Sequence, residues 1–335
     1  MHIAGGWRTQ FVALAAIWGS SFLFIKVLDR HWSPTWVALG RVALGAATLV
    51  VLVYARGERL RVPRSAWPHI LIAALFLNAI PFTLFAYGEH HVSSVVAGLW
   101  NASAPLWVLA FVLLVFGDEQ LTRTRAAGLA FGFAGVVLLL GPWRGLGGGE
   151  AIGHLACAGA AVCYGIGFPY ARRFVATRPE SGVVLAAAQL LCATAVLALF
   201  TPFTAAPTVQ IGAGGVLSII VLGILGTGVA YVLNYAILRA AGATTAATVT
   251  YLVPVFSTVL GAVVLREIVH WNQPVGAAVL LTGIAISRMA LPDWQLRRKR
   301  RRLLACDRQR VLETAPGRAV DDALGEHPRV QRERH

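Results

Sequence analysis

The chain has 335 residues, of which 57% are hydrophobic and only 13% are charged, and its mean hydropathy is +0.67. Soluble domains carry about 25% charged residues, so this composition excludes an ordinary water-soluble fold for most of the chain. The net charge of +14 would indicate nucleic-acid binding in a soluble protein. The positions of the basic residues, described below, give it another explanation.

Long apolar stretches follow one another along the chain. A transmembrane helix needs roughly 20 predominantly apolar residues, and ten stretches come near this length. They are residues 11–28, 36–55, 69–87, 92–115, 126–141, 151–170, 181–200, 215–238, 244–265 and 274–291. The sequence therefore predicts an all-α membrane protein with ten transmembrane helices. Residues 292–335 are polar and rich in charge, and we expect a disordered basic tail there.

The basic residues indicate the orientation of these helices. If the N-terminus is cytoplasmic, most Lys and Arg residues fall in cytoplasmic segments, including the run at residues 297–302. Only Lys26, Arg30, Arg144 and Arg266 fall outside. This asymmetry follows the positive-inside rule, so we expect a multi-pass protein of the plasma or inner membrane with both termini cytoplasmic. The run at 297–302 either orients the last helix or also binds anionic lipid, and no nucleic-acid partner is needed.

The two halves of the chain repeat one another. Landmark residues of the first half recur in the second half in the same order, at offsets of 146 to 149 residues. In the first half they are Trp18, Gly19, Tyr87, Pro105, Glu119, Gly128 and Gly135; in the second half they are Tyr164, Gly165, Tyr235, Pro254, Glu267, Gly276 and Gly283. Arg41 falls opposite Gln189. Such ordered recurrence indicates an internal duplication.

The number of helices in each repeat determines how the halves are related. Five is an odd number, so the second half must enter the membrane from the opposite side. Inverted repeats of this kind are typical of secondary transporters, in which the two halves exchange conformations and alternate access to a central site. We therefore predict one five-helix repeat at residues 11–141 and a second at residues 151–291.

The motifs also resemble a known family. AAIWGSSFLFIK (15–26), the stretch 97–140 with FGDEQLT (116–122), CYGIGFPYARR (163–173) and LREIVHWNQPVG (265–276) are similar to the two halves of an EamA-type member of the drug/metabolite transporter superfamily. The resemblance covers roughly residues 11–288. It implies ten helices, cytoplasmic termini, a central cavity and transport of amino acids, other metabolites or toxic compounds, often outward. Glu267 follows Arg266, where the family usually has Gly-Glu.

Few ionisable residues lie within the predicted helices. Arg41 can either bind a substrate carboxylate through its two parallel N–H groups or snorkel to the outer surface. His154 is interpreted as a residue at a helix end, with a titrating role as the alternative. Glu89, His90 and His91 are interpreted as a solvated loop, with an outer gate or proton sensor as the alternative. No Asp or Glu is expected deep in any span, so no carboxylate site for ion coupling is predicted.

Polar and aromatic residues at mid-depth are the remaining candidates for a substrate cavity. With Arg41 they make the full candidate set: Trp18, Ser21, Asn78, Trp100, Asn101, Tyr164, Gln189, Tyr231, Asn234 and Tyr251. Aromatic rings wall cavities or hold cations, and amide side chains form hydrogen bonds with a solute. The alternative for each one is a structural hydrogen bond between helices.

Residues that weaken helices suggest where the protein bends. The hinge candidates are Pro81, Pro105, Pro254, Gly226 and Gly228. The pair Gly128 and Gly132 forms a small-residue packing face, used either within the chain or in a homodimer. Glu119 and Glu267 are expected to stabilise the positive N-terminus of the next helix.

These patterns predict a secondary transporter, most simply an exporter, of small metabolites such as amino acids. The alternatives are an exporter of toxic organic compounds or a membrane-embedded enzyme. An enzyme is less favoured because the chain has no HExxH or GxSxG motif and no paired intramembrane Asp. The chain also has no P-loop motif, so ATP is not expected to drive transport directly. The cysteines show no metal-binding spacing either, so the expected partners are a small-molecule substrate and lipid, without a metal or cofactor.

Overall fold

The computed structural model describes residues 6–29, 31–116, 122–141, 143, 148–204, 212–234, 236–237, 240 and 248–289. Regular structure in this part of the chain is entirely helical, without a strand. A chain of this hydropathy is expected to be helical, because a helix satisfies its backbone polar groups without water. The predicted tail 292–335, its basic run 297–302 and Glu119 lie outside the described residues.

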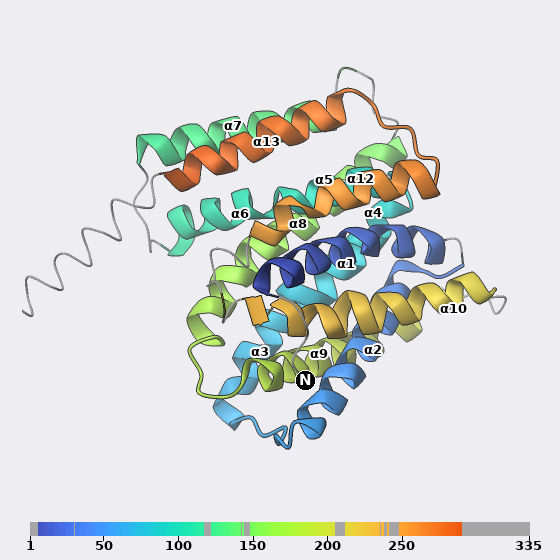
Figure 1. The fold of residues 1–335 in the computed structure, drawn as a ribbon, viewed down its shortest axis with the longest axis vertical. Helices are drawn as coiled ribbons and strands as arrows, with labels where there is room; N and C mark the ends of the chain where they lie inside the picture. The colour runs from blue at the N-terminus through green and yellow to red at the C-terminus, as the bar shows by residue number, and fades with distance from the viewer. Residues whose placement is uncertain are drawn as a thin grey trace, which may run out of the picture. The chain divides into compact units, whose positions relative to one another are not determined.

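The helices follow the order of the predicted apolar stretches (Figure 1). The first half contains α1 (Trp7–Leu28), α2 (Pro34–Ala55), η1 (Arg64–Ala66), α3 (Trp67–Ala74), η2 (Leu75–Ala79), α4 (Ile80–Glu89), α5 (Ser94–Ala102), α6 (Ala104–Phe111), η3 (Val112–Phe116) and α7 (Arg123–Leu140). The second half contains α8 (Gly148–Phe174), α9 (Gly182–Phe200), η5 (Thr201–Phe203), α10 (Ala213–Ile220), η6 (Val221–Val229), η7 (Thr248–Tyr251), α12 (Val253–Val264) and α13 (Asn272–Met289).

Many of these helices have the dimensions of membrane spans. Seven described stretches are long and apolar enough to cross a bilayer: Trp7–Leu28, Pro34–Ala55, Arg64–Glu89, Ser94–Phe111, Gly148–Phe174, Gly182–Phe203 and Ala213–Asn234. Three shorter apolar helices, Ala126–Leu140, Val249–Val264 and Asn272–Ile286, lie at the other predicted segments. The protein is therefore a multi-pass helical membrane protein, and the number of ten spans stays a prediction.

Several stretches are interrupted at the predicted hinge residues. Pro81 follows the π-helical segment η2, and Gly226 and Gly228 lie inside the π-helical segment η6. Pro105 and Pro254 lie in the first turns of α6 and α12, where a missing N–H breaks no helical hydrogen bond. The residues chosen from the sequence thus lie at real irregularities, and π-helical segments are frequent at functional sites.

Packing between the two halves occurs in equivalent pairs. α1 packs against α12, and α8, the repeat counterpart of α1, packs against α6. Likewise α2 packs against η6, and α9 packs against α3. At the first pair, a Cβ added to Gly19 would lie 2.9 Å from the Val253 carbonyl oxygen. One added to Gly165 would lie 2.7 Å from the Trp107 Cβ. Glycines at matching positions therefore permit close helix contact in both halves.

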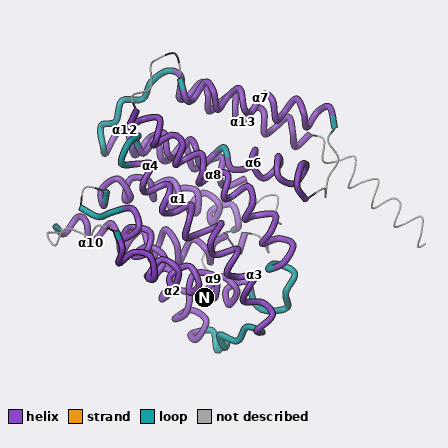
Figure 2. Tube along the Cα trace, turned by 180° about the vertical axis from the view of Figure 1, so that it is seen from behind, coloured by secondary structure: helices purple, strands orange, loops and turns teal. Residues whose placement is uncertain are grey.

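A seam of glycines joins α7 to α13. The two helices lie side by side in both views (Figures 1 and 2). A Cβ on Gly135 would lie 2.8 Å from the Gly276 carbonyl oxygen, and one on Gly283 would lie 2.6 Å from that of Gly128. Gly135 and Gly283 are counterparts in the repeat, as are Gly128 and Gly276, so the two contacts are equivalent. The small-residue face predicted around Gly128 and Gly132 is therefore used within one chain, where it lets two backbones touch.

Candidate functional site

Arg41 is the charged residue at the centre of the packed helices. Its side chain is only 8% exposed. Its Nε donates to Thr227 Oγ1 at 3.0 Å and its Nη2 to the Gly226 carbonyl oxygen at 3.5 Å. The guanidinium also lies 4.0 Å from the centre of the Phe82 ring. Arg41 therefore points inward from α2 toward η6 and does not snorkel to a surface.

The positive charge of Arg41 lacks a close anion. No carboxylate of the described residues forms an ion pair with its guanidinium; its contacts there are a hydroxyl, a carbonyl oxygen and an aromatic face. Removing a charge from water is costly unless it is paired or hydrogen-bonded. Two hydrogen bonds use only part of the five N–H donors of an arginine, so the group retains capacity to bind an anion.

Asn78 is the centre of a buried amide network. It is 0% exposed. Its Oδ1 accepts a hydrogen bond from Gln189 Nε2 at 2.6 Å, and its Nδ2 donates to the Tyr231 hydroxyl at 2.9 Å. The three side chains come from η2, α9 and the helix that continues η6. Three of the predicted cavity residues are therefore brought together by direct hydrogen bonds.

These two sets of contacts are related by the sequence repeat. Arg41 is the counterpart of Gln189, and at the same offset Gly226 is the counterpart of Asn78. The contact of Arg41 with Gly226 thus corresponds to the contact of Gln189 with Asn78. One pair carries a charge and the other is neutral, so the centre is symmetric in position and asymmetric in chemistry.

Aromatic rings extend from this polar centre along one face of α4. Phe82 lies under Arg41, and Phe85 contacts both Phe22 and Tyr164, with ring centroids 5.6 and 6.0 Å apart. Phe22, Phe82 and Phe85 are buried. Rings arranged edge-to-face pack favourably and define shape. Tyr164, a predicted cavity residue, therefore lies next to the network.

The remaining candidates lie at varying distance from the network. Trp18, Trp100 and Tyr251 belong to a neighbouring apolar cluster that also includes Phe85 and Tyr164. Ser21 is buried and donates to the Ile17 carbonyl oxygen of its own helix. Asn101 and Asn234 are half-buried, and no hydrogen bond of the described residues links either side chain to Asn78 or Arg41. Their role stays a prediction.

Three charged or titratable residues have surroundings that the sequence did not predict. His154 lies near the start of α8, as expected for a residue at a helix end, but it is buried and its Nδ1 accepts a hydrogen bond from Trp100 Nε1, 2.9 Å away. Glu267 binds the start of α5 rather than that of the next helix, through Ser94 N, Ser94 Oγ and Val95 N at 2.9, 2.9 and 3.1 Å.

Glu89 is the third correction. The helix runs two residues beyond the predicted span, and Glu89 is its last residue, 0% exposed. The expectation of a solvated loop at Glu89 was wrong, because Glu89 is a buried carboxyl group at the end of a helix. The spacing 82, 85, 89 places Glu89 on the face of α4 that carries Phe82 and Phe85. That spacing is the signal in the sequence that would have found it.

Removing Asn78 tests whether the hydrogen-bonded side chains of the amide network stabilise one another. An Asn78→Leu variant leaves Gln189 Nε2 and the Tyr231 hydroxyl buried without partners, and we expect it to lower the free energy of unfolding by about 1–3 kcal/mol. In Asn78→Leu/Gln189→Leu one of the orphaned groups is gone, so part of the loss is recovered. Thermal unfolding in detergent measures the stability of the single and the double variant, with Asn234→Leu as control. If the loss of stability in the double variant equalled the sum of the losses from the separate substitutions, Asn78 and Gln189 would not be coupled as described.

Comparison with known proteins agrees with this architecture. The model of the EamA-like transporter family matches twice, at residues 7–141 and 151–289. The chain belongs to the EamA-like transporter family. The relatives of this EamA-like chain include the uncharacterized transporter YvbV of Bacillus subtilis, 24% identical over 278 residues that cover 82% of this chain and 88% of YvbV. The uncharacterized inner membrane transporter YedA of Escherichia coli K12 is 27% identical over 74% of this chain and 79% of its own.

Two further comparisons support the same fold for this EamA-like protein. An uncharacterized transporter of Archaeoglobus fulgidus is 27% identical over 80% of this chain and 94% of its own. One solved crystal structure matches with a TM-score of 0.61 and 23% identity, covering 85% of this chain and 98% of that chain. At this identity the likeness concerns the fold alone. The protein is thus an EamA-like membrane transporter, and the comparisons name no substrate.

Proposed function

We propose that this EamA-like protein is a secondary transporter that exports small metabolites, such as amino acids or related organic solutes, by alternating access. The observation that carries the proposal is the buried centre shared by the two halves. There Arg41 contacts Gly226 in the other half and Gln189 contacts Asn78, at equivalent positions of the repeat. A site between inverted repeats is exposed to one side of the membrane or the other as the halves rock.

The charge of this centre favours a solute that bears a carboxylate. Arg41 is buried, has unused N–H donors and forms no ion pair with a carboxylate of the described residues. Planar bidentate pairing suits an arginine and a carboxylate. The neutral amides of Asn78 and Gln189 are available to bind the polar remainder of the solute. We infer that the carboxylate of the transported metabolite binds Arg41.

The proposal includes ten spans, with residues 11–141 and 151–291 as inverted five-helix repeats. The positive-inside rule places both termini in the cytoplasm of a plasma or inner membrane. Symmetric glycine contacts support the inversion. The contact of Gly135 with Gly276 and that of Gly283 with Gly128 join counterpart residues of the two repeats. Transport needs no cofactor in this scheme, and we assign the protein no enzymatic activity.

Counterflow in proteoliposomes tests the function. Vesicles that contain the purified protein are loaded with a mixture of the twenty common amino acids, and uptake of each radiolabelled amino acid is then followed. We expect exchange of at least one of them above the level of empty vesicles. Exchange of organic cations alone would support export of toxic compounds instead. No exchange of amino acids, organic acids or cations would contradict a metabolite transporter.

A further inference from the structure

Glu89 is a buried carboxyl group that the proposed binding site leaves unused. It ends α4, is 0% exposed, and neither of its carboxyl oxygens has a hydrogen-bond partner in the described part of the chain. Buried polar groups in proteins are almost always hydrogen-bonded, so each exception requires an explanation. Glu267, by contrast, accepts three hydrogen bonds at the start of α5. Among the described residues, Glu89 is the carboxyl group of which both oxygens are buried without a hydrogen bond.

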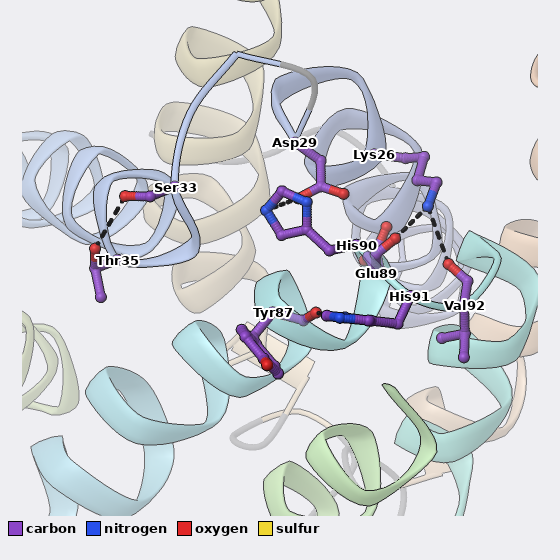
Figure 3. A network of polar contacts seen from close by, with 9 residues as sticks. All are labelled: Lys26, Asp29, Ser33, Thr35, Tyr87, Glu89, His90, His91 and Val92. Atoms are coloured by element: carbon purple, nitrogen blue, oxygen red, sulfur yellow. Dashed lines mark hydrogen bonds and ion pairs between the residues drawn. The ribbon is translucent and has the colours of Figure 1, made fainter. Parts of the chain in front are cut away.

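The polar groups around Glu89 are engaged elsewhere (Figure 3). The Lys26 ammonium donates to the backbone carbonyl oxygens of Glu89 and Val92, the latter at 3.0 Å, and not to the carboxyl group. Asp29 pairs with His90 at 2.6 Å. These contacts fasten the end of α1 to the corner between α4 and α5. In this closed arrangement the Glu89 side chain is fully buried.

Both signs of charge surround this carboxyl group. The charged and titratable groups that face it from the elements packed around α4 are Lys26 and Asp29 of α1, Arg41 of α2, Cys157 of α8 and Glu267 after α12, with His90 and His91 beside it in the chain. A carboxylate that is buried without donors is costly, and such a group becomes neutral by taking up a proton. In this closed arrangement, burial therefore favours the protonated, neutral form of the Glu89 carboxyl group.

The face of α4 connects Glu89 to the proposed binding site. Asn78, Phe82, Phe85 and Glu89 recur at intervals of 4, 3 and 4 residues and are all buried. Phe82 lies under Arg41, and Asn78 is the centre of the amide network. Asn78 lies within the π-helical segment η2, and Pro81 lies in the first turn of α4, which carries Phe82, Phe85 and Glu89. A rotation of α4 at this irregularity therefore moves Phe82, which contacts Arg41, together with the carboxyl group of Glu89.

We propose that Glu89 couples transport to protons, an inference that rests on the proposed transport function. In the closed arrangement its carboxyl oxygen holds one proton in an O–H bond. When α4 turns, the group meets water on one side of the membrane, the O–H bond breaks, and the proton passes to that water. A proton from the opposite side is taken up in the other half of the cycle. Each cycle thus moves one proton, and a pH gradient drives the solute.

The main test compares exchange with gradient-driven accumulation. Proteoliposomes with wild type, Glu89→Gln or Glu150→Gln receive the twenty radiolabelled amino acids with and without an imposed pH gradient. Glutamine imitates the neutral acid, so we expect Glu89→Gln to retain exchange and lose all gradient-driven accumulation. Glu150 is an exposed carboxyl group at the start of α8, and its variant is expected to retain both activities. Glu89→Asp keeps a carboxyl group and is expected to restore accumulation partly.

A second readout needs no transported solute. In infrared spectra of the purified protein titrated with acid and base, we expect a protonated carboxyl band near neutral pH in wild type and Glu150→Gln that is missing in Glu89→Gln. Gradient-driven accumulation by Glu89→Gln, or the same band in that variant, would overturn the proposal. A folded Glu89→Gln protein without exchange would also overturn it, because Glu89 would then be needed for solute binding and not for proton coupling. Absence of exchange in wild type, with the band present, would refute the transport function instead.

Discussion

Arg41→Ala is expected to raise the half-saturating solute concentration in counterflow about 10- to 100-fold. The estimate follows from losing hydrogen bonds to a charged group, worth about 1.5–3 kcal/mol in a buried site. Arg41 is 8% exposed and contacts Thr227, Gly226 and the Phe82 ring, so its guanidinium is fixed before any solute arrives. A fixed group loses little entropy on binding.

Two further variants separate charge from geometry. Arg41→Lys keeps the positive charge but not the planar pair of donors, and we expect activity between wild type and Arg41→Ala. Arg123→Ala removes an exposed arginine from the start of α7 and is expected to leave transport unchanged. Thermal unfolding of each variant in detergent checks that the fold is intact. A folded Arg41→Ala protein with wild-type half-saturation for every carboxylate-bearing solute would remove Arg41 from the binding site.

Gly283→Leu is expected to have the largest effect on stability, a loss of about 3 kcal/mol. A Cβ at this position already lies 2.6 Å from the Gly128 carbonyl oxygen and 2.7 Å from the Gly132 Cα, so the added side chain meets backbone. Backbone atoms have no rotamer that avoids the contact, and α7 must separate from α13. Overpacking of well-packed interiors costs about 1–3 kcal/mol even where side chains adjust.

The matched control for the seam is Gly214→Leu. Gly214 lies in α10 and is exposed, and a Cβ added to it would meet no atom of another element within 4 Å. We expect its midpoint of thermal unfolding in detergent to stay close to wild type while that of Gly283→Leu falls. Because the seam lies within one chain, light scattering should show the same oligomeric state for both. Equal midpoints would show that α7 and α13 do not touch as described.

Much of the fold was predictable because a membrane imposes strong local constraints. Apolar runs of span length become helices since no other conformation satisfies the backbone in lipid. Prolines and glycines marked the irregular segments, as Pro81 and Gly226 illustrate. The repeat also carried information about packing, because Gly135 and Gly283 were matched in sequence before they were found in the same seam.

The site was only partly predictable, since apolar periodicity says little about which face of a helix meets which neighbour. Asn78, Gln189 and Tyr231 were chosen as polar residues at mid-depth, and the structure joins them by hydrogen bonds. Thr227, which binds Arg41, was not among the candidates, and Glu89 was interpreted as part of a solvated loop, with an outer gate or proton sensor as the alternative. Thr227 lies in an apolar stretch, and its importance arises from a contact with Arg41 that no local pattern records. The burial of Glu89 was indicated only by its helical spacing from Phe82 and Phe85.

The sequence by itself determined the class of protein, the order of the helices and the duplication, because these depend on local hydropathy and on recurrent residues. Only the tertiary structure decided where the critical side chains point. It turned Arg41 inward to η6, used Gly128 within the chain and enclosed Glu89 behind the contact of Lys26 with α4. These outcomes depend on contacts between helices distant in sequence, and such contacts fix whether a charge meets water, a partner or neither.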